Sequence, residues 1–110
     1  MSIAEPVQGL VGLARRANLL AIGFAACAEA VNKNKAAAIL LAEDLSAASA
    51  TRFRKRLGAF SGPIEIHGKK SEWGRLLGRE QAGILAILDR GLAAAISEKL
   101  RAPGSPDEQQ

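Results

Sequence analysis

The chain has 110 residues and a formal net charge of +4, and its 48% hydrophobic content excludes intrinsic disorder of the whole chain. Its single cysteine, Cys27, excludes both an intrachain disulfide framework and a four-cysteine zinc site. The longest apolar run, Ala36–Ala42, is far shorter than the ~20 residues of a membrane helix, and Ser2–Glu5 lacks the basic start of a secretory signal. We therefore expect a cytoplasmic protein without membrane contact.

The first half of the chain predicts two helices and two strands in alternation. Apolar residues three and four apart predict a helix over residues 7–16, with Pro6 in its first turn. A brief strand over residues 19–22 ends at Gly23. The second helix carries an apolar stripe of Phe24, Cys27, Ala28 and Val31. The run 36–42 is apolar at every position, which is typical of a central buried strand in a parallel sheet.

The second half continues the same alternation. Ser46 is a suitable N-cap for a third helix, whose apolar stripe consists of Ala50, Phe53, Leu57 and Phe60. Residues 64–66 alternate like a half-buried strand, and a short fourth helix runs from a cap at Ser71 to a stop at Gly78. An apolar strand over residues 82–88 and a last helix over residues 91–101 complete the pattern.

This alternation predicts an α/β fold, a single-domain three-layer α/β/α sandwich with a central mixed sheet of about four strands. The domain spans residues 1–102. Residues 103–110 contain two prolines and a glycine and read as a flexible C-terminal tail.

No catalytic, metal or cofactor site is predicted. His67 is the only histidine, and we expect it to be a surface or capping residue. Cys27 lies on an apolar helix stripe, and we expect it to be a core residue. The segment 68–71 (GKKS) lacks the spacing of a phosphate loop. Glu43 and Asp44 are adjacent and point opposite ways if extended, so one faces the loop and the other caps the next helix. We therefore expect no enzyme activity.

Basic residues gather in three places: Arg15 and Arg16, Lys33 and Lys35, and the run Arg52, Arg54, Lys55 and Arg56. Helical spacing puts Arg52, Lys55 and Arg56 on one exposed face. Two interpretations stay open, an ordinary solvated face and a surface that contacts phosphates. The first free N–H groups after Gly23 are a further candidate anion site, unless this glycine only eases the turn.

Two segments, Val11–Ala17 (VGLARRA) and Leu40–Asp44 (LLAED), carry a resemblance to a known family, which Leu77-Gly78 and the strand ending Ile87-Leu88-Asp89 continue. In order and spacing they resemble the ribosomal-protein superfamily that includes large-subunit proteins seven-Ae and thirty-e, in particular its bacterial YlxQ-like branch. The resemblance covers roughly Val7 to Leu100. It implies the same three-layer sandwich.

The resemblance implies binding of RNA kink-turns through two loops, Gly23–Ala26 and Gly78–Gly83. The RNA-binding residues it implies are Gly23, Phe24, Ala25, Ala26, Glu29, Lys33, Glu43, Arg79, Glu80, Gln81, Ala82 and Gly83. Kink-turn binders of this family carry Gly-x-Asn-Glu-x-x-Lys at the helix start. This chain keeps the glycine but has Ala25, Ala26 and Glu29 at the other three positions. We therefore expect RNA binding driven by shape and charge, with weakened kink-turn selectivity.

Two alternatives remain at this stage. The apolar residues Phe24, Ala25 and Ala26 at the helix start are also suited to an adaptor module that binds a protein partner or forms a weak homodimer. A similar small domain precedes the catalytic domain of some RNA ribose methyltransferases, so the chain is also compatible with a substrate-recognition fragment.

Overall fold

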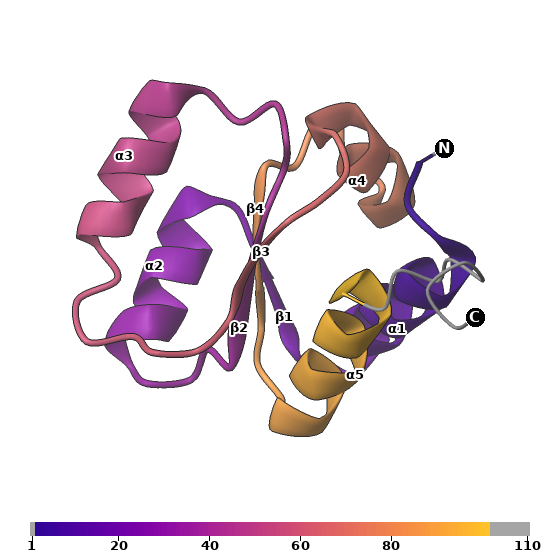
Figure 1. The fold of residues 1–110 in the computed structure, drawn as a ribbon, viewed down its shortest axis with the longest axis horizontal. Coiled ribbons are helices and arrows are strands. Elements are labelled where there is room, and N and C mark those ends of the chain that lie inside the picture. Colours follow the sequence, from indigo (N-terminus) through magenta and orange to yellow (C-terminus); the bar gives the residue numbers. More distant parts are fainter. Residues whose placement is uncertain (1, 102–110) are drawn as a thin grey trace, which may run out of the picture.

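The computed structural model describes residues 2–101 and forms three layers (Figure 1). The helices are α1 (Glu5–Arg16), α2 (Phe24–Asn32), α3 (Ala47–Lys55), α4 (Lys70–Leu77) and α5 (Arg90–Arg101). The strands are β1 (Leu20–Ile22), β2 (Ala38–Leu41), β3 (Ile64–Ile66) and β4 (Ile84–Ile87). Helices α2 and α3 cover one face of the sheet, and α1, α4 and α5 cover the other (Figure 1). The predicted sandwich is confirmed, whereas the predicted tail lies outside the described residues.

The sheet is mixed, with the strand order β1-β4-β2-β3. Strand β2 runs parallel to β3, but β4 is antiparallel to both β1 and β2. The interpretation of 36–42 as part of a parallel sheet therefore holds only on its β3 side. In the register, Leu41 lies opposite Ile84 and Ile66, and Ile22 lies opposite Leu85. The carboxyl ends of β1, β2 and β3 thus meet the amino end of β4 at one edge of the sheet.

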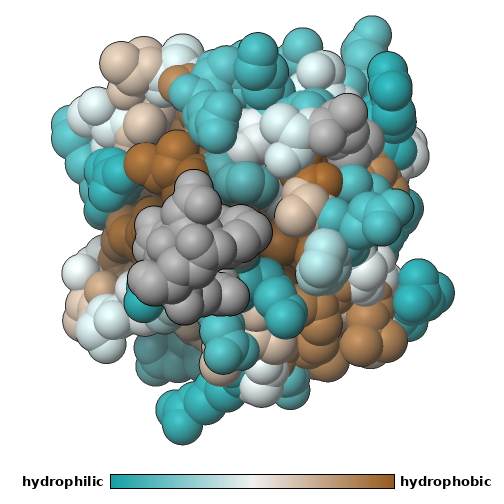
Figure 2. Space-filling model, turned by 45° about the vertical axis from the view of Figure 1, so that its right-hand side comes forward, coloured by the Kyte–Doolittle hydropathy of each residue, from teal (hydrophilic) through white to brown (hydrophobic). Residues whose placement is uncertain are grey.

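Two hydrophobic cores flank the sheet because β2 and β4 are buried on both faces. In β2, Leu40 packs into the core beneath α1, α4 and α5, and Ile39 into the core beneath α2 and α3. Phe53 and Trp73 are the largest fully buried side chains, one in each core. Hydrophilic residues cover most of the face turned to the viewer in Figure 2, with smaller hydrophobic areas between them. None of the described helices is long and apolar enough to cross a lipid bilayer.

The helix starts confirm one predicted cap and correct another. The Ser46 hydroxyl accepts a hydrogen bond from the Ser49 N–H at 3.1 Å and caps α3, as predicted. The prediction that Ser71 caps α4 is wrong, since that helix begins at Lys70. Carboxylates take the role instead: Glu72 accepts from the Lys69 N–H at 2.9 Å, and Asp44 accepts from the Lys70 N–H at 2.9 Å. These acceptors satisfy the backbone amides of the two residues directly before Ser71.

Candidate nucleic-acid interface

The two loops that the sequence analysis singled out meet at the sheet edge described above. The Gly23 N–H donates to the Ile84 carbonyl oxygen at 2.8 Å, which ties the start of α2 to β4. The Ala42 N–H donates to the Gly83 carbonyl oxygen at 2.9 Å, which ties the end of β2 to the segment before β4. Backbone hydrogen bonds therefore hold the predicted residues of the two loops close together.

Gly23 has a backbone conformation that other residues rarely adopt, with φ 97° and ψ 164°. A Cβ placed there would meet no atom within 4 Å, so the glycine is required by the backbone angle rather than by crowding. No side chain in the described part of the chain caps α2 at this position. The first N–H groups of α2 are thus left for a ligand at an open surface, where the helix dipole favours an anion.

The first turns of α2 expose small side chains and one ion pair. Ala25 and Ala26 are exposed, and their methyl groups offer no hydrogen-bond donor or acceptor. The Glu29 carboxylate lies 3.3 Å from the Lys33 ammonium in an exposed pair one turn apart. Because these charges compensate each other, α2 contributes little net charge at the position where kink-turn binders have a lysine.

The loop between α4 and β4 divides the other predicted residues into two groups. Arg79, Glu80 and Gln81 are exposed, and Arg79 lines a shallow groove together with residues 26, 29 and 33. Ala82 is buried at 4% exposure, so its side chain anchors the loop and faces no ligand. Its N–H donates to the Lys70 carbonyl oxygen at 3.0 Å.

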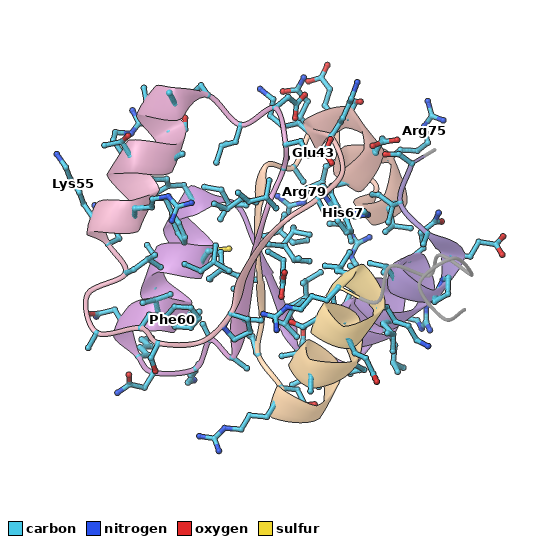
Figure 3. The ribbon with its side chains drawn as sticks, in the orientation of Figure 1. Glu43, Lys55, Phe60, His67, Arg75 and Arg79 are labelled. Atoms are coloured by element: carbon cyan, nitrogen blue, oxygen red, sulfur yellow. The ribbon has the colours of Figure 1, made fainter. Side chains whose placement is uncertain are left out.

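Glu43 is exposed on the turn after β2, at the same edge of the sheet (Figure 3). Its neighbour Asp44 is the capping carboxylate, as predicted for one of the two, but it caps α4 and not the next helix. Lys70, which was not among the predicted residues, also lies here: its side-chain carbons would be 3.4 Å from a Cβ at Gly83. No local signal in the sequence predicts this contact, because it depends on how the α4–β4 loop folds back onto the first residue of α4.

The side chains of the basic run Arg52–Arg56 point in two directions. The guanidinium carbons of Arg52 and Arg56 lie 5.6 Å and 5.7 Å from the centre of the Phe24 ring. Lys55 points away from α2 (Figure 3), so the predicted common face of Arg52, Lys55 and Arg56 is only partly correct. Phe24 itself packs edge-to-face on Phe53, with ring centres 5.5 Å apart. The first residue of α2 therefore connects the basic part of α3 to the sheet edge.

The contacts of His67 and Cys27 indicate structural roles for both residues. The His67 carbonyl oxygen accepts a hydrogen bond from the Trp73 indole N–H at 2.7 Å. Cys27 is fully buried, its thiol lies 3.4 Å from the Ala21 carbonyl oxygen, and burial raises the pKa of the thiol to about 12. A thiol with this pKa stays protonated near neutral pH, as expected of a core residue. Within residues 2–101, no three histidine, cysteine or carboxylate side chains group as they would around a metal ion.

Comparison with known proteins identifies one family. The model of the Ribosomal protein L7Ae/L30e/S12e/Gadd45 family matches residues 5–97. A similar solved structure is that of a protein with unknown function from Bacillus halodurans, 26% identical in sequence, with a TM-score of 0.72. That similarity covers 87% of this chain and 100% of the other. No curated protein matches this chain significantly.

Proposed function

Because the chain belongs to the Ribosomal protein L7Ae/L30e/S12e/Gadd45 family, we propose that it is a non-enzymatic protein of the cytoplasm that binds structured RNA, in association with ribosomes. The observation that carries this proposal is the amino end of α2 at Gly23, which no side chain of the described residues caps. Cationic side chains flank it, Arg79 from the α4–β4 loop and Arg56 from the position directly after α3.

The chemistry of this surface suits an RNA backbone. Free N–H groups at a helix start bind phosphate oxygens, and guanidinium groups donate paired hydrogen bonds to the same oxygens. Such contacts are independent of sequence and weaken as the salt concentration rises. The proposed contact residues are those named in the sequence analysis, except that Ala82 supports the loop from within.

Kink-turn selectivity is proposed to be weak. Asparagine and glutamate side chains can hydrogen-bond to guanine edges, whereas the exposed methyl groups of Ala25 and Ala26 cannot. If each lost base contact is worth ~1–3 kcal/mol, as in DNA groove recognition, the two together lower the preference by ~2–6 kcal/mol. RNA shape and charge would then decide which RNA is bound.

The adaptor alternative has less support than the sequence suggested. Phe24 is half-buried against Phe53 and lies beneath two arginines, so the apolar patch reduces to the methyl groups of Ala25 and Ala26. A patch of this size is small compared with the apolar surfaces that mark protein interfaces.

The direct test is a titration of the protein with a kink-turn RNA, a straight duplex and a scrambled loop over a salt series. We expect binding to all three at ~50 mM salt, with affinity falling steeply as salt rises. Absence of binding to every RNA at that salt concentration would overturn the proposed function. A large preference for the kink-turn would overturn only the proposal of weak selectivity.

A gain-of-function variant tests selectivity from the other side. Restoring the family's motif with Ala25→Asn, Ala26→Glu and Glu29→Lys should raise the preference for kink-turn RNA roughly 30-fold to 10⁴-fold over the straight duplex. The control is Ala94→Asn with Glu98→Lys, two exposed positions of α5 on the other face of the sheet. This control should leave the preference unchanged.

A further inference from the structure

We propose that Arg52 of α3 and Arg56, the residue directly after this helix, form a second contact with the RNA backbone, beside the start of α2. This inference rests on the proposed function and extends its surface onto a helix that the two predicted loops do not include. It decides between the two interpretations of the basic run: part of that run contacts phosphates, and the rest is a solvated face.

The position of the two arginines is the first support. Their guanidinium carbons lie 5.6 Å and 5.7 Å from the centre of the Phe24 ring, and Phe24 is the first residue of α2. The ring in turn packs edge-to-face on Phe53, which is 0% exposed. The core therefore fixes the ring, and the ring holds both cationic groups beside the side chain of the first residue of α2.

The chemistry left available on these arginines is the second support. An aromatic ring occupies the face of a guanidinium group, while the N–H groups at its edge stay available for a phosphate. Both arginines are exposed, and α3 contains no acidic residue. Within residues 2–101, the ion pairs are Lys33 with Glu29 and Arg101 with Glu65, so neither arginine is neutralised there by a carboxylate.

The shape between α2 and α3 is the third support. A shallow groove is lined by Phe24, Ala25, Ala28, Glu29, Asn32 and Arg56. Small side chains at positions 25 and 28 let a sugar–phosphate chain approach the helix, and Asn32 and Arg56 supply hydrogen-bond donors. The one acidic residue, Glu29, is paired with Lys33. An RNA strand that contacts the start of α2 can therefore continue along this groove.

The test compares two double variants that remove the same charge from α3 and the residue directly after it. Arg52→Gln with Arg56→Gln removes the pair at Phe24, and Arg54→Gln with Lys55→Gln removes two exposed charges of the same helix that take no part in it. With kink-turn RNA at ~100 mM salt, the first variant should bind about tenfold more weakly, because two phosphate contacts are lost. Its log-affinity against log-salt slope should shrink by about 1.4–1.8, and the control should change little.

The outcomes separate this inference from the proposed function. If the wild-type protein binds no RNA, the proposed function fails and this inference fails with it. If the wild-type protein binds and both double variants lose equal affinity, only net charge matters and the second contact does not exist. Polyglutamate serves as a competing polyanion, and competition as strong as that of unlabelled RNA would assign the surface to acidic proteins instead.

A third variant tests whether the ring positions the arginines. Phe24→Leu keeps both cations and much of the buried apolar volume but removes the aromatic face. We expect RNA affinity to fall less than in the double arginine variant, with little change in the salt slope. Circular dichroism and thermal unfolding confirm that the variant is folded. Unchanged affinity in a folded Phe24→Leu variant would overturn the positioning role of Phe24.

Discussion

The Asp44 carboxylate accepts a hydrogen bond of 2.9 Å from the backbone N–H of Lys70, 26 residues further along the chain. The bond joins the turn after β2 to the first residue of α4. A carboxylate at this place satisfies an amide that the helix itself leaves free and also interacts favourably with the helix dipole. It thereby fixes one side of the sheet edge at which the proposed RNA surface lies.

Replacing Asp44 with alanine should therefore destabilise the protein. We expect Asp44→Ala to lower the free energy of unfolding by about 0.5–2 kcal/mol, as for the loss of a helix-capping carboxylate. Urea unfolding followed by circular dichroism measures the change. The control is Glu43→Ala, the exposed neighbour, which should stay within ~0.5 kcal/mol of the wild type. Equal effects of the two substitutions would show that the bond to α4 is unimportant.

The α4–β4 loop packs closely against Gly74 of α4. A Cβ at this position would lie 2.7 Å from the Glu80 carbonyl oxygen and 2.8 Å from that of Arg79. Because both contacts are with backbone, the loop must move to accept Gly74→Ala. We expect a loss of about 1–3 kcal/mol in the free energy of unfolding, typical of overpacking, and weaker RNA binding as Arg79 is displaced. Thermal unfolding and RNA titration measure the two effects.

Gly9 provides the matched control for this substitution. It lies inside α1, and a Cβ there would meet no atom within 4 Å. Gly9→Ala should therefore stabilise the protein by up to about 1 kcal/mol through the higher helix propensity of alanine. If Gly74→Ala is as stable as Gly9→Ala, the close packing of the loop on α4 is wrong.

Local pattern was sufficient to predict the fold. Strands β2 and β4 are apolar at every position, and both are buried on two faces at the centre of the sheet. Gly78 was predicted to end α4 and does so with a left-handed φ of 73°. These features depend on residues that are close together in the sequence, so the local pattern of apolar residues and glycines is enough to predict them.

Two of the errors concern contacts between distant elements. The cap of α4 was predicted at Ser71 because a nearby hydroxyl is the local candidate, whereas one acceptor, Asp44, comes from the turn after β2. Helical spacing placed Lys55 with Arg52, but the partner that selects between them is Phe24 on another helix. A helical wheel shows which residues share a face and does not show what that face meets.

Because the thiol of Cys27 is buried, we expect the free energy of unfolding to depend on pH in the alkaline range. Burial raises its pKa in the folded protein from about 9.0 to about 12. As the pH rises from 9 toward 12, the unfolded chain releases this proton while the folded protein retains it, so the free energy of unfolding falls. Urea unfolding across this range should show a steeper fall for wild type than for Cys27→Ala. Identical slopes would contradict the burial of an ionisable thiol.

The ion pair between Glu29 and Lys33 adds little to the stability of the protein, but the Glu29 carboxylate weakens the attraction of α2 for RNA phosphates. Both side chains are exposed, so the pair stabilises the helix by only ~0.3–0.5 kcal/mol. Glu29→Gln should leave unfolding almost unchanged but increase RNA affinity about two- to tenfold at ~50 mM salt, because it removes repulsion and leaves Lys33 for a phosphate. The same charge change at Glu98, exposed on α5, should have much less effect on RNA affinity. Equal gains from both substitutions would mean that overall charge, and not the start of α2, controls binding.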